Sequence, residues 1–154
     1  MTRLIGVDHG SRRIGLAVGD TKTGLAFARH AHRRTNEAAD LAALAALAAS
    51  EGADGWVVGL PLLEDGRRGE QARRAATFAD RLAQASGRPV IQVDERFTSW
   101  QAGSDLAEAG RRPDRRSGEL DSAAARLILQ QCLDDLAGRG RAGTDPVPTT
   151  EEPA

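Results

Sequence analysis

The segment GWVVGLP, residues 55–61, most constrains what this 154-residue chain can fold into. Its apolar residues run without a polar break, which is typical of a strand covered on both faces of a sheet. Leu41, Leu44 and Leu47 recur at helical spacing before it, and a second helical pattern follows it. A strand between two helices predicts an α/β fold. Pro61 ends this strand because proline cannot donate to a ladder.

Apolar periodicity and turn residues predict the other elements of the chain. The expected strands are 3–8, 14–18, 24–29, 55–61 and 89–96. The expected helices are one beginning near Asn36, capped by Thr35 or Asn36, and those at 69–86, 98–109 and 119–137. This order predicts a five-stranded mixed sheet, in which a three-stranded antiparallel meander and two parallel strands carry helices on both faces.

Length and composition predict one soluble domain over residues 1–137. Residues 138–154 are rich in Gly, Pro, Thr and Glu, so we expect a disordered tail there. The single cysteine, Cys132, cannot form an internal disulfide, which favours a reducing compartment. There is no signal-peptide pattern and no stretch of about 20 apolar residues. We therefore expect a cytoplasmic protein with no membrane contact.

Acidic residues follow two of the expected strands. Asp8 ends the first, and Asp94 and Glu95 end the last. Ligands in such sheets collect beyond the carboxyl ends of the strands. Because neighbouring strand residues point to opposite faces, one of the latter pair is expected to join Asp8, and we favour Glu95 for its longer reach. Whether Asp94 also turns inward at the strand end stays open. Asp121 lies in the first turn of the last helix, where the helix dipole by itself accounts for an acid. It joins the site only if that helix begins beside Asp8.

Three carboxylates in one pocket repel one another, and a divalent cation removes that cost. Oxygen ligands suit Mg²⁺ or Mn²⁺. Zinc is disfavoured, because the chain has one cysteine and its three histidines lack ligand spacing. Two such ions can bind the attacking water and the leaving oxygen of a phosphodiester. The acids therefore point to metal-dependent phosphodiester hydrolysis.

Arginines flank the acids, although the net charge of the whole chain is only −1. They are Arg12 and Arg13 after Asp8, and Arg111, Arg112, Arg115 and Arg116 before Asp121. The planar guanidinium suits phosphate, and four such contacts would give a log–log salt slope of about −3 to −4. A solvated charged surface is the alternative explanation.

Small residues alternate on one face of the second strand, at Gly15, Ala17 and Gly19. Low bulk there allows a helix to pack closely on the sheet, or a nucleic-acid strand to approach it. We favour helix packing and keep both interpretations open.

Four motifs in this order resemble the YqgF (RuvX) family. They are GVDHGSRRIGLAVGD, VVGLPLLEDGRRGEQARRAATFADRL, VDERFTS and LDSAAARLIL, and the resemblance covers about residues 4–136. These bacterial proteins are described as Holliday junction resolvases and as nucleases that mature the small-subunit ribosomal RNA precursor. The resemblance implies a ribonuclease H-like fold with Asp8, Glu95 and Asp121 as metal-binding acids. It also implies that Arg96 and Thr98 place the substrate or brace the acids.

The leading hypothesis is a metal-dependent endonuclease that processes the 5′ end of the 16S rRNA precursor in ribosome biogenesis. Asp8 would bridge two Mg²⁺ or Mn²⁺ ions, with Glu95 and Asp121 on either side. One alternative is cleavage of a four-way DNA junction, which requires two matched cuts and hence a two-fold dimer. Another is a non-catalytic RNA-binding factor in ribosome assembly. The expected partners are nucleic acid and the ribosome, and the choice between monomer and homodimer stays open.

Overall fold

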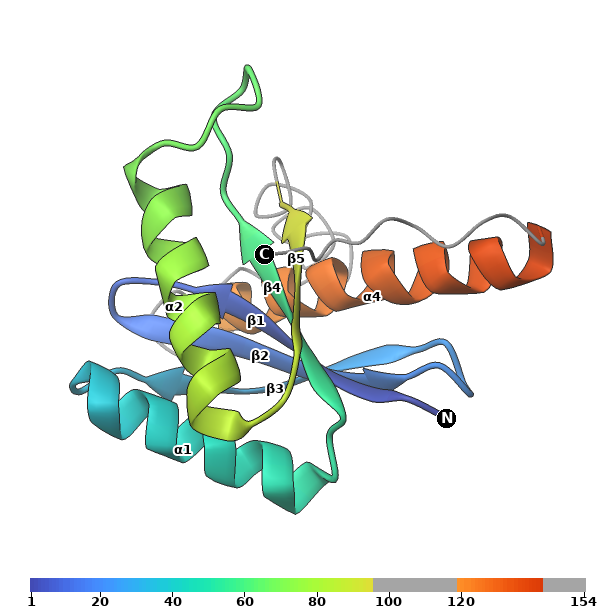
Figure 1. Cartoon of the computed structure of the whole chain (residues 1–154), viewed down its shortest axis with the longest axis horizontal. Coiled ribbons are helices and arrows are strands. Elements are labelled where there is room, and N and C mark those ends of the chain that lie inside the picture. Colours follow the sequence, from blue (N-terminus) through green and yellow to red (C-terminus); the bar gives the residue numbers. More distant parts are fainter. Residues whose placement is uncertain (96–118, 143–154) are drawn as a thin grey trace.

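The computed structural model describes residues 1–95 and 119–142, and Figure 1 shows their arrangement. The strands are β1 (Arg3–His9), β2 (Arg13–Asp20), β3 (Ala26–Arg33), β4 (Gly55–Leu60) and β5 (Val90–Asp94). The helices are α1 (Glu37–Glu51), α2 (Glu70–Ser86) and α4 (Glu119–Ala142). The expected helix at 98–109 lies outside the described residues. None of the helices within the described ranges combines the length and apolar character that a membrane span requires.

The sheet has the order β3-β2-β1-β4-β5. β1 pairs antiparallel with β2, and β2 pairs antiparallel with β3. β4 lies parallel to both β1 and β5. The predicted meander followed by two parallel strands is therefore confirmed, and the carboxyl ends of β1, β4 and β5 share one edge of the sheet.

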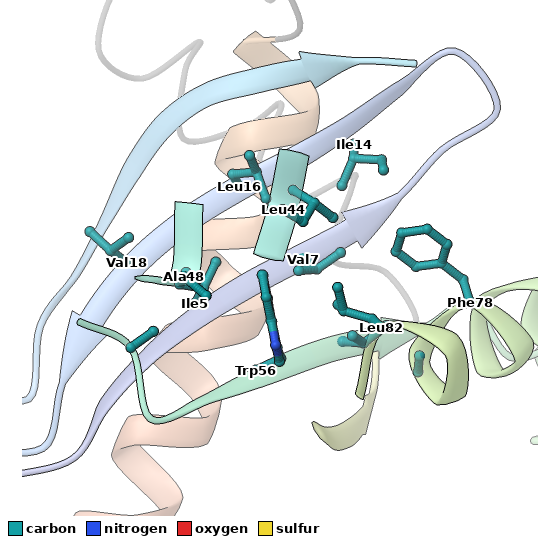
Figure 2. Close-up of a cluster of buried hydrophobic side chains, with 13 residues drawn as sticks. Ile5, Val7, Ile14, Leu16, Val18, Leu44, Ala48, Trp56, Phe78 and Leu82 are labelled. Carbon is teal, nitrogen blue, oxygen red and sulfur yellow. The ribbon is translucent and has the colours of Figure 1, made fainter. Parts of the chain in front are cut away.

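Helices cover both faces of this sheet, and the side chains of β1 alternate between the two layers. α1 and α2 cover one face, where Ile5 and Val7 pack with Leu44 and Phe78 (Figure 2). α4 crosses the other face, where Leu4 belongs to a second apolar cluster (Figure 1). All six residues of β4 are buried, as its unbroken apolar run predicted. Each large side chain buried in these layers contributes about 1.5–3 kcal/mol.

The helix ends follow the expected local chemistry. Asn36 caps α1 and its side chain accepts a hydrogen bond from the N–H of Ala39, 2.9 Å away. Gly87 ends α2 with a φ of 67°, a left-handed conformation that costs glycine little. Both positions agree with the sequence prediction.

Four elements extend beyond their predicted bounds: β1 and β2 by only one or two residues at an end, and β3 and the last helix by more. The third strand was expected at 24–29, but Gly24 belongs to the preceding turn and β3 continues to Arg33, which pairs with Arg13. Its second half, His30–Arg33, is only partly buried and mostly polar, and it carries no apolar alternation that could have marked it. The last helix continues to Ala142 instead of ending at residue 137. Gly138 weakens a helix by about 1 kcal/mol relative to alanine but does not end it.

The stripe of small residues in β2 is explained by α4, which lies directly on it. A Cβ atom on Gly15 would overlap the backbone carbonyl of Asp121. On Gly19 it would meet the carbonyl oxygen of Leu25 at 2.6 Å and Leu133 Cδ1 of α4 at 3.0 Å, and on Gly6 of β1 it would lie 2.8 Å from the carbonyl oxygen of Ala125. Helix packing, the favoured interpretation, is therefore the observed one.

Replacing Gly15 with alanine is expected to push the first turn of α4 away from the sheet, because the obstructing atoms are backbone and cannot rotate aside. The free energy of unfolding in urea should fall by about 1–3 kcal/mol or more. Gly138→Ala, in α4 itself, is the control, since nothing lies within 4 Å of its added methyl group. That variant should be neutral, or more stable by up to about 1 kcal/mol. Equal stability of the two variants would contradict this account of the packing.

Candidate active site

Asp8 and Glu95 meet at the carboxyl edge of the parallel strands. Asp8 is the penultimate residue of β1, and Glu95 directly follows β5, where its backbone N–H donates to the carbonyl of Leu60 at 3.1 Å. Gly59 of β4 lies between the two strands, and a Cβ atom there would overlap Oε1 of Glu95. The Glu95 side chain therefore crosses the space above Gly59 and reaches hydrogen-bonding contact with Asp8.

This contact changes the proton affinity of both acids. Burial, followed by the charge of Asp121, raises the pKa of Asp8 from 3.8 to about 6, and the hydrogen bond with Glu95 acts in the opposite direction. Burial, the charge of Asp8 and the hydrogen bond with Asp8 raise the pKa of Glu95 from 4.5 to about 9. At neutral pH Glu95 therefore holds a proton and donates it to Asp8. Asp94 contributes only a smaller repulsion to Glu95, so Glu95 is the member of the pair that joins Asp8.

Asp121 reaches the same end of the sheet through α4. The first turn of α4 lies on Gly15, which is directly opposite Asp8 in the β1–β2 pair. Next to it, Ser122 Oγ accepts a hydrogen bond from the backbone N–H of Leu16 at 3.4 Å. Arg13 donates from Nε to Oδ2 of Asp121 at 3.3 Å. The helix thus begins beside Asp8, and Asp121 is paired with a cation there.

The donor set suits a hard divalent cation at Asp8 and Glu95. Within residues 1–95 and 119–142, no three His, Cys, Asp or Glu side chains form a ready-made metal-binding group. The Asp8–Glu95 pair nevertheless offers carboxylate oxygens, and the buried Oε1 of Glu95 receives no hydrogen bond from any described group. A divalent cation held by Asp8 and Glu95 would satisfy such an oxygen and take the place of the shared proton. Asp121 enters the same set only if its carboxylate leaves Arg13.

A cleft of about 1200 Å³ opens over this end of the sheet and includes both acids. Its walls contain five arginines, namely Arg12, Arg13, Arg33, Arg34 and Arg74. The first two were expected from the sequence. The other three come from the end of β3, the β3–α1 connection and α2, and only the fold gathers them. The remaining expected substrate residues, Arg96, Thr98, Arg111, Arg112, Arg115 and Arg116, lie outside the described residues.

An ion pair between Arg34 and the buried Asp40 lines the cleft on the α1 side. Asp40 of α1 is fully buried and accepts hydrogen bonds from Arg34 Nε at 3.0 Å and from the N–H of Thr35 at 3.0 Å. His32 Nε2 lies 2.9 Å from the same carboxylate. Burial favours the neutral acid, but these three donors outweigh it and keep the pKa of Asp40 below its ordinary value. Asp40 is therefore ionised and ties α1 to the end of β3.

Arg34 extends this network to the turn that follows Asp8. Its Nη1 donates to the carbonyl of Gly10 at 3.0 Å and contacts His9 Nε2 at 2.9 Å. Because a guanidinium can only donate, the histidine nitrogen is the acceptor and the ring is neutral. Burial and the charge of Arg34 accordingly lower the pKa of His9 to about 4. The His9 ring also packs on Phe78, with ring centroids 4.6 Å apart. No local sequence pattern indicated this network, because its members belong to four separate elements.

Removing the Asp40 carboxylate is expected to be strongly destabilising, because Arg34 and the N–H of Thr35 lose their buried partner. Asp40→Ala should lower the free energy of unfolding by about 3 kcal/mol, measured by urea titration. Glu37→Ala is the control on the same helix, since Glu37 pairs with the half-exposed Arg81, and it should cost less than about 1 kcal/mol. The double variant Arg34→Ala/Asp40→Ala should cost less than the sum of the two single changes. A loss below 1 kcal/mol for Asp40→Ala would contradict the assigned pairing.

The raised pKa values of Asp8 and Glu95 predict an unusual pH dependence. Both acids hold protons more tightly in the folded chain, so their contribution to stability is present below about pH 4 and lost as the pH rises through 6 and 9. In EDTA, the free energy of unfolding should therefore be lower at pH 9 than at pH 5. Glu95→Gln should flatten this dependence, whereas an equally steep fall in that variant would refute the shared proton. Mn²⁺ should stabilise the unmodified chain more at pH 8 than at pH 5, because only deprotonated carboxylates bind it.

Known proteins resemble this chain over most of its length. The family described as "RuvX: Holliday junction resolvase" matches residues 2–135. A protein of Anaeromyxobacter dehalogenans (strain 2CP-1), named "Putative pre-16S rRNA nuclease", is 46% identical over 135 residues, or 88% of this chain and 98% of the relative. A protein of a Synechococcus species with the same name is 40% identical over 144 residues, or 91% of this chain and 94% of the relative.

Solved structures resemble this chain in their fold. The Thermus thermophilus RuvC in complex with a Holliday junction substrate superposes with a TM-score of 0.55 and 16% sequence identity, covering 90% of this chain and 97% of that chain. RuvC has a ribonuclease H-like fold, and the predicted fold class is therefore confirmed. Since the family match spans nearly the whole described sheet and its helices, and relatives share 40–46% of their residues with it, this chain belongs to the RuvX family.

Proposed function

We propose that this chain is an endonuclease that hydrolyses phosphodiester bonds in structured nucleic acid, with the 16S rRNA precursor as substrate and the cytoplasm as its site of action. The observation that carries the proposal is the contact between Asp8 and Glu95 at the edge of the sheet, inside a cleft whose walls contain five arginines. The relatives named as pre-16S rRNA nucleases, which cover most of the chain, support the choice of substrate.

Asp8, Glu95 and Asp121 are the proposed ligands of Mg²⁺ or Mn²⁺. Such ions, when bound, activate the attacking water and neutralise charge on the leaving 3′ oxygen. Asp8 and Glu95 supply oxygens that must lose their shared proton before they can bind a cation. Until a cation binds, Arg13 holds Asp121 beside Asp8 and screens the charge of the Asp121 carboxylate.

Arginines are the proposed contacts to the backbone of the substrate. Arg12 is exposed in the cleft next to the acids, and its guanidinium suits a phosphate. Arg96, Thr98, Arg111, Arg112, Arg115 and Arg116 are proposed for the same task on sequence grounds alone. Contacts of this type position the backbone and carry no sequence information, so choice among substrates must come from the shape of the nucleic acid.

A four-way DNA junction is the second candidate substrate. The description of the matching family as a Holliday junction resolvase favours it. Paired cuts in a junction need two active sites related by a two-fold axis. A dimer that cleaves the junction symmetrically in preference to RNA would support this candidate, and a chain that stays monomeric at micromolar concentration would oppose it.

Asp8→Asn should abolish cleavage, because it removes the charge that the cation needs and keeps the shape of the side chain. We expect at least about a 100-fold loss of the single-turnover rate with Mn²⁺, equivalent to about 3 kcal/mol. A precursor fragment carrying the 16S 5′ leader and an immobile four-way DNA junction should be offered in parallel. Asp80→Asn on the exposed side of α2 is the matched control and should retain full activity.

Two outcomes of this experiment would overturn the proposal. Undiminished cleavage by Asp8→Asn would remove Asp8 from the reaction. Retained RNA binding by the unmodified chain, together with no cleavage and no Mn²⁺ binding in calorimetry, would instead favour a non-catalytic RNA-binding factor in ribosome assembly.

A further inference from the structure

Four arginines are crowded at one end of the β2–β3 hairpin. Arg13 and Arg33 are directly opposite each other in the register of these antiparallel strands. Beside them, the backbone N–H of Arg34 donates to the carbonyl of Arg12 at 2.9 Å. Like charges placed directly opposite in a sheet destabilise it. The hairpin end therefore has an electrostatic cost that acidic partners must offset.

Acids among residues 1–95 and 119–142 pair with only two of these four arginines. Arg13 pairs with Asp121 and Arg34 pairs with the buried Asp40. Arg12 and Arg33 are exposed, and neither guanidinium has an acidic or hydrogen-bonding partner among residues 1–95 and 119–142. Both line the cleft that contains the acids. Within the part of the chain that the structure describes, they are thus two cations available to an anion.

The distance of these two arginines from Asp8 suits the spacing of phosphates in a nucleic-acid backbone. Directly opposite residues of an antiparallel pair share a face, so Arg33 lies on the same face of the sheet as Arg13, which pairs with Asp121 of α4. Neighbouring strands are about 4.8 Å apart, which places the end of β3 about 10 Å from the end of β1. Phosphates that neighbour each other along one nucleic-acid strand can span that separation.

The strand order also places Arg12 and Arg33 on one side of the acids. β2 and β3 lie on one side of β1, and β4 and β5 lie on the other. The unpaired arginines therefore flank the Asp8–Glu95 pair on the β3 side, at the end of the meander. A backbone that followed the edge of the sheet would meet Arg33 and Arg12 before it reached the acids.

We propose that Arg33, together with Arg12, forms a phosphate-binding flank that holds the nucleic-acid backbone next to the scissile bond. The substrate strand crosses the end of the sheet from β3 towards β5, and Arg13, which pairs with Asp121 in this structure, is not part of the flank. This inference rests on the proposed function, because it assigns a path to the substrate of that site.

The salt dependence of binding tests this flank. A fluorescein-labelled RNA carrying the 16S 5′ leader is titrated with the full chain in EDTA, so that no cleavage occurs, at KCl concentrations from 25 to about 200 mM. Arg33→Gln should reduce the magnitude of the log–log salt slope by about 0.7–0.9, the value of one phosphate contact. Arg12→Gln/Arg33→Gln should reduce it by about twice that amount. RNA of unrelated sequence should lose affinity to the same degree.

Two control variants separate substrate contact from a structural effect. Arg33→Lys keeps the charge and should retain the slope of the unmodified chain. Arg29→Gln removes an exposed arginine from the same strand, where it faces Glu51 and lies outside the cleft, so its slope should be unchanged. Thermal unfolding without RNA should show Arg33→Gln to be at least as stable as the unmodified chain, since a repulsion is relieved.

Different results would refute the phosphate-binding flank and the proposed nuclease function. If the unmodified chain binds and cleaves its substrate while Arg33→Gln keeps the full salt slope, the flank is refuted and the nuclease stands. An equal loss of slope in Arg29→Gln would also refute the flank, because the effect would then follow net charge. If the unmodified chain binds neither the RNA nor the DNA junction, the proposed function itself is wrong.

Discussion

The close approach of α4 to the sheet is the constraint on which the site depends. The carbonyl of Asp121 occupies the space that a side chain on Gly15 would fill. Gly15 is directly opposite Asp8, so the same contact that closes the core also sets the distance between Asp121 and Asp8. A change in the packing of α4 on the sheet would therefore also change the electrostatics of the acidic site.

Acids gathered in this way are unfavourable for the chain alone. Asp8 and Glu95 reduce the cost by sharing a proton, and Asp121 reduces it by pairing with Arg13. Both arrangements are reversible, because a proton can leave and the partly exposed guanidinium of Arg13 can rotate. A site that binds a divalent cation needs carboxylates that are held close together but are not permanently paired. The observed arrangement meets that requirement.

The arginines of the cleft fall into two groups with different partners. Arg13 and Arg34 pair with acids of the chain, and Arg34 further holds the turn after Asp8 through Gly10 and His9. Arg12 and Arg33 lack such partners within the described ranges. An arginine-rich sequence alone does not distinguish these groups, because identical side chains become structural or available according to which carboxylate the fold places nearby.

The sequence by itself determined the elements whose signals are local. The buried strand β4, the cap at Asn36, the stop at Gly87 and the strand-end positions of Asp8 and Glu95 all follow from a few neighbouring residues. The family motifs in the sequence also predicted the fold class. Tertiary structure alone decided the second half of β3, the Arg34–Asp40 network and the pairing of Arg13 with Asp121. These features depend on which distant residues meet, and backbone periodicity carries no information about partners that lie tens of residues apart.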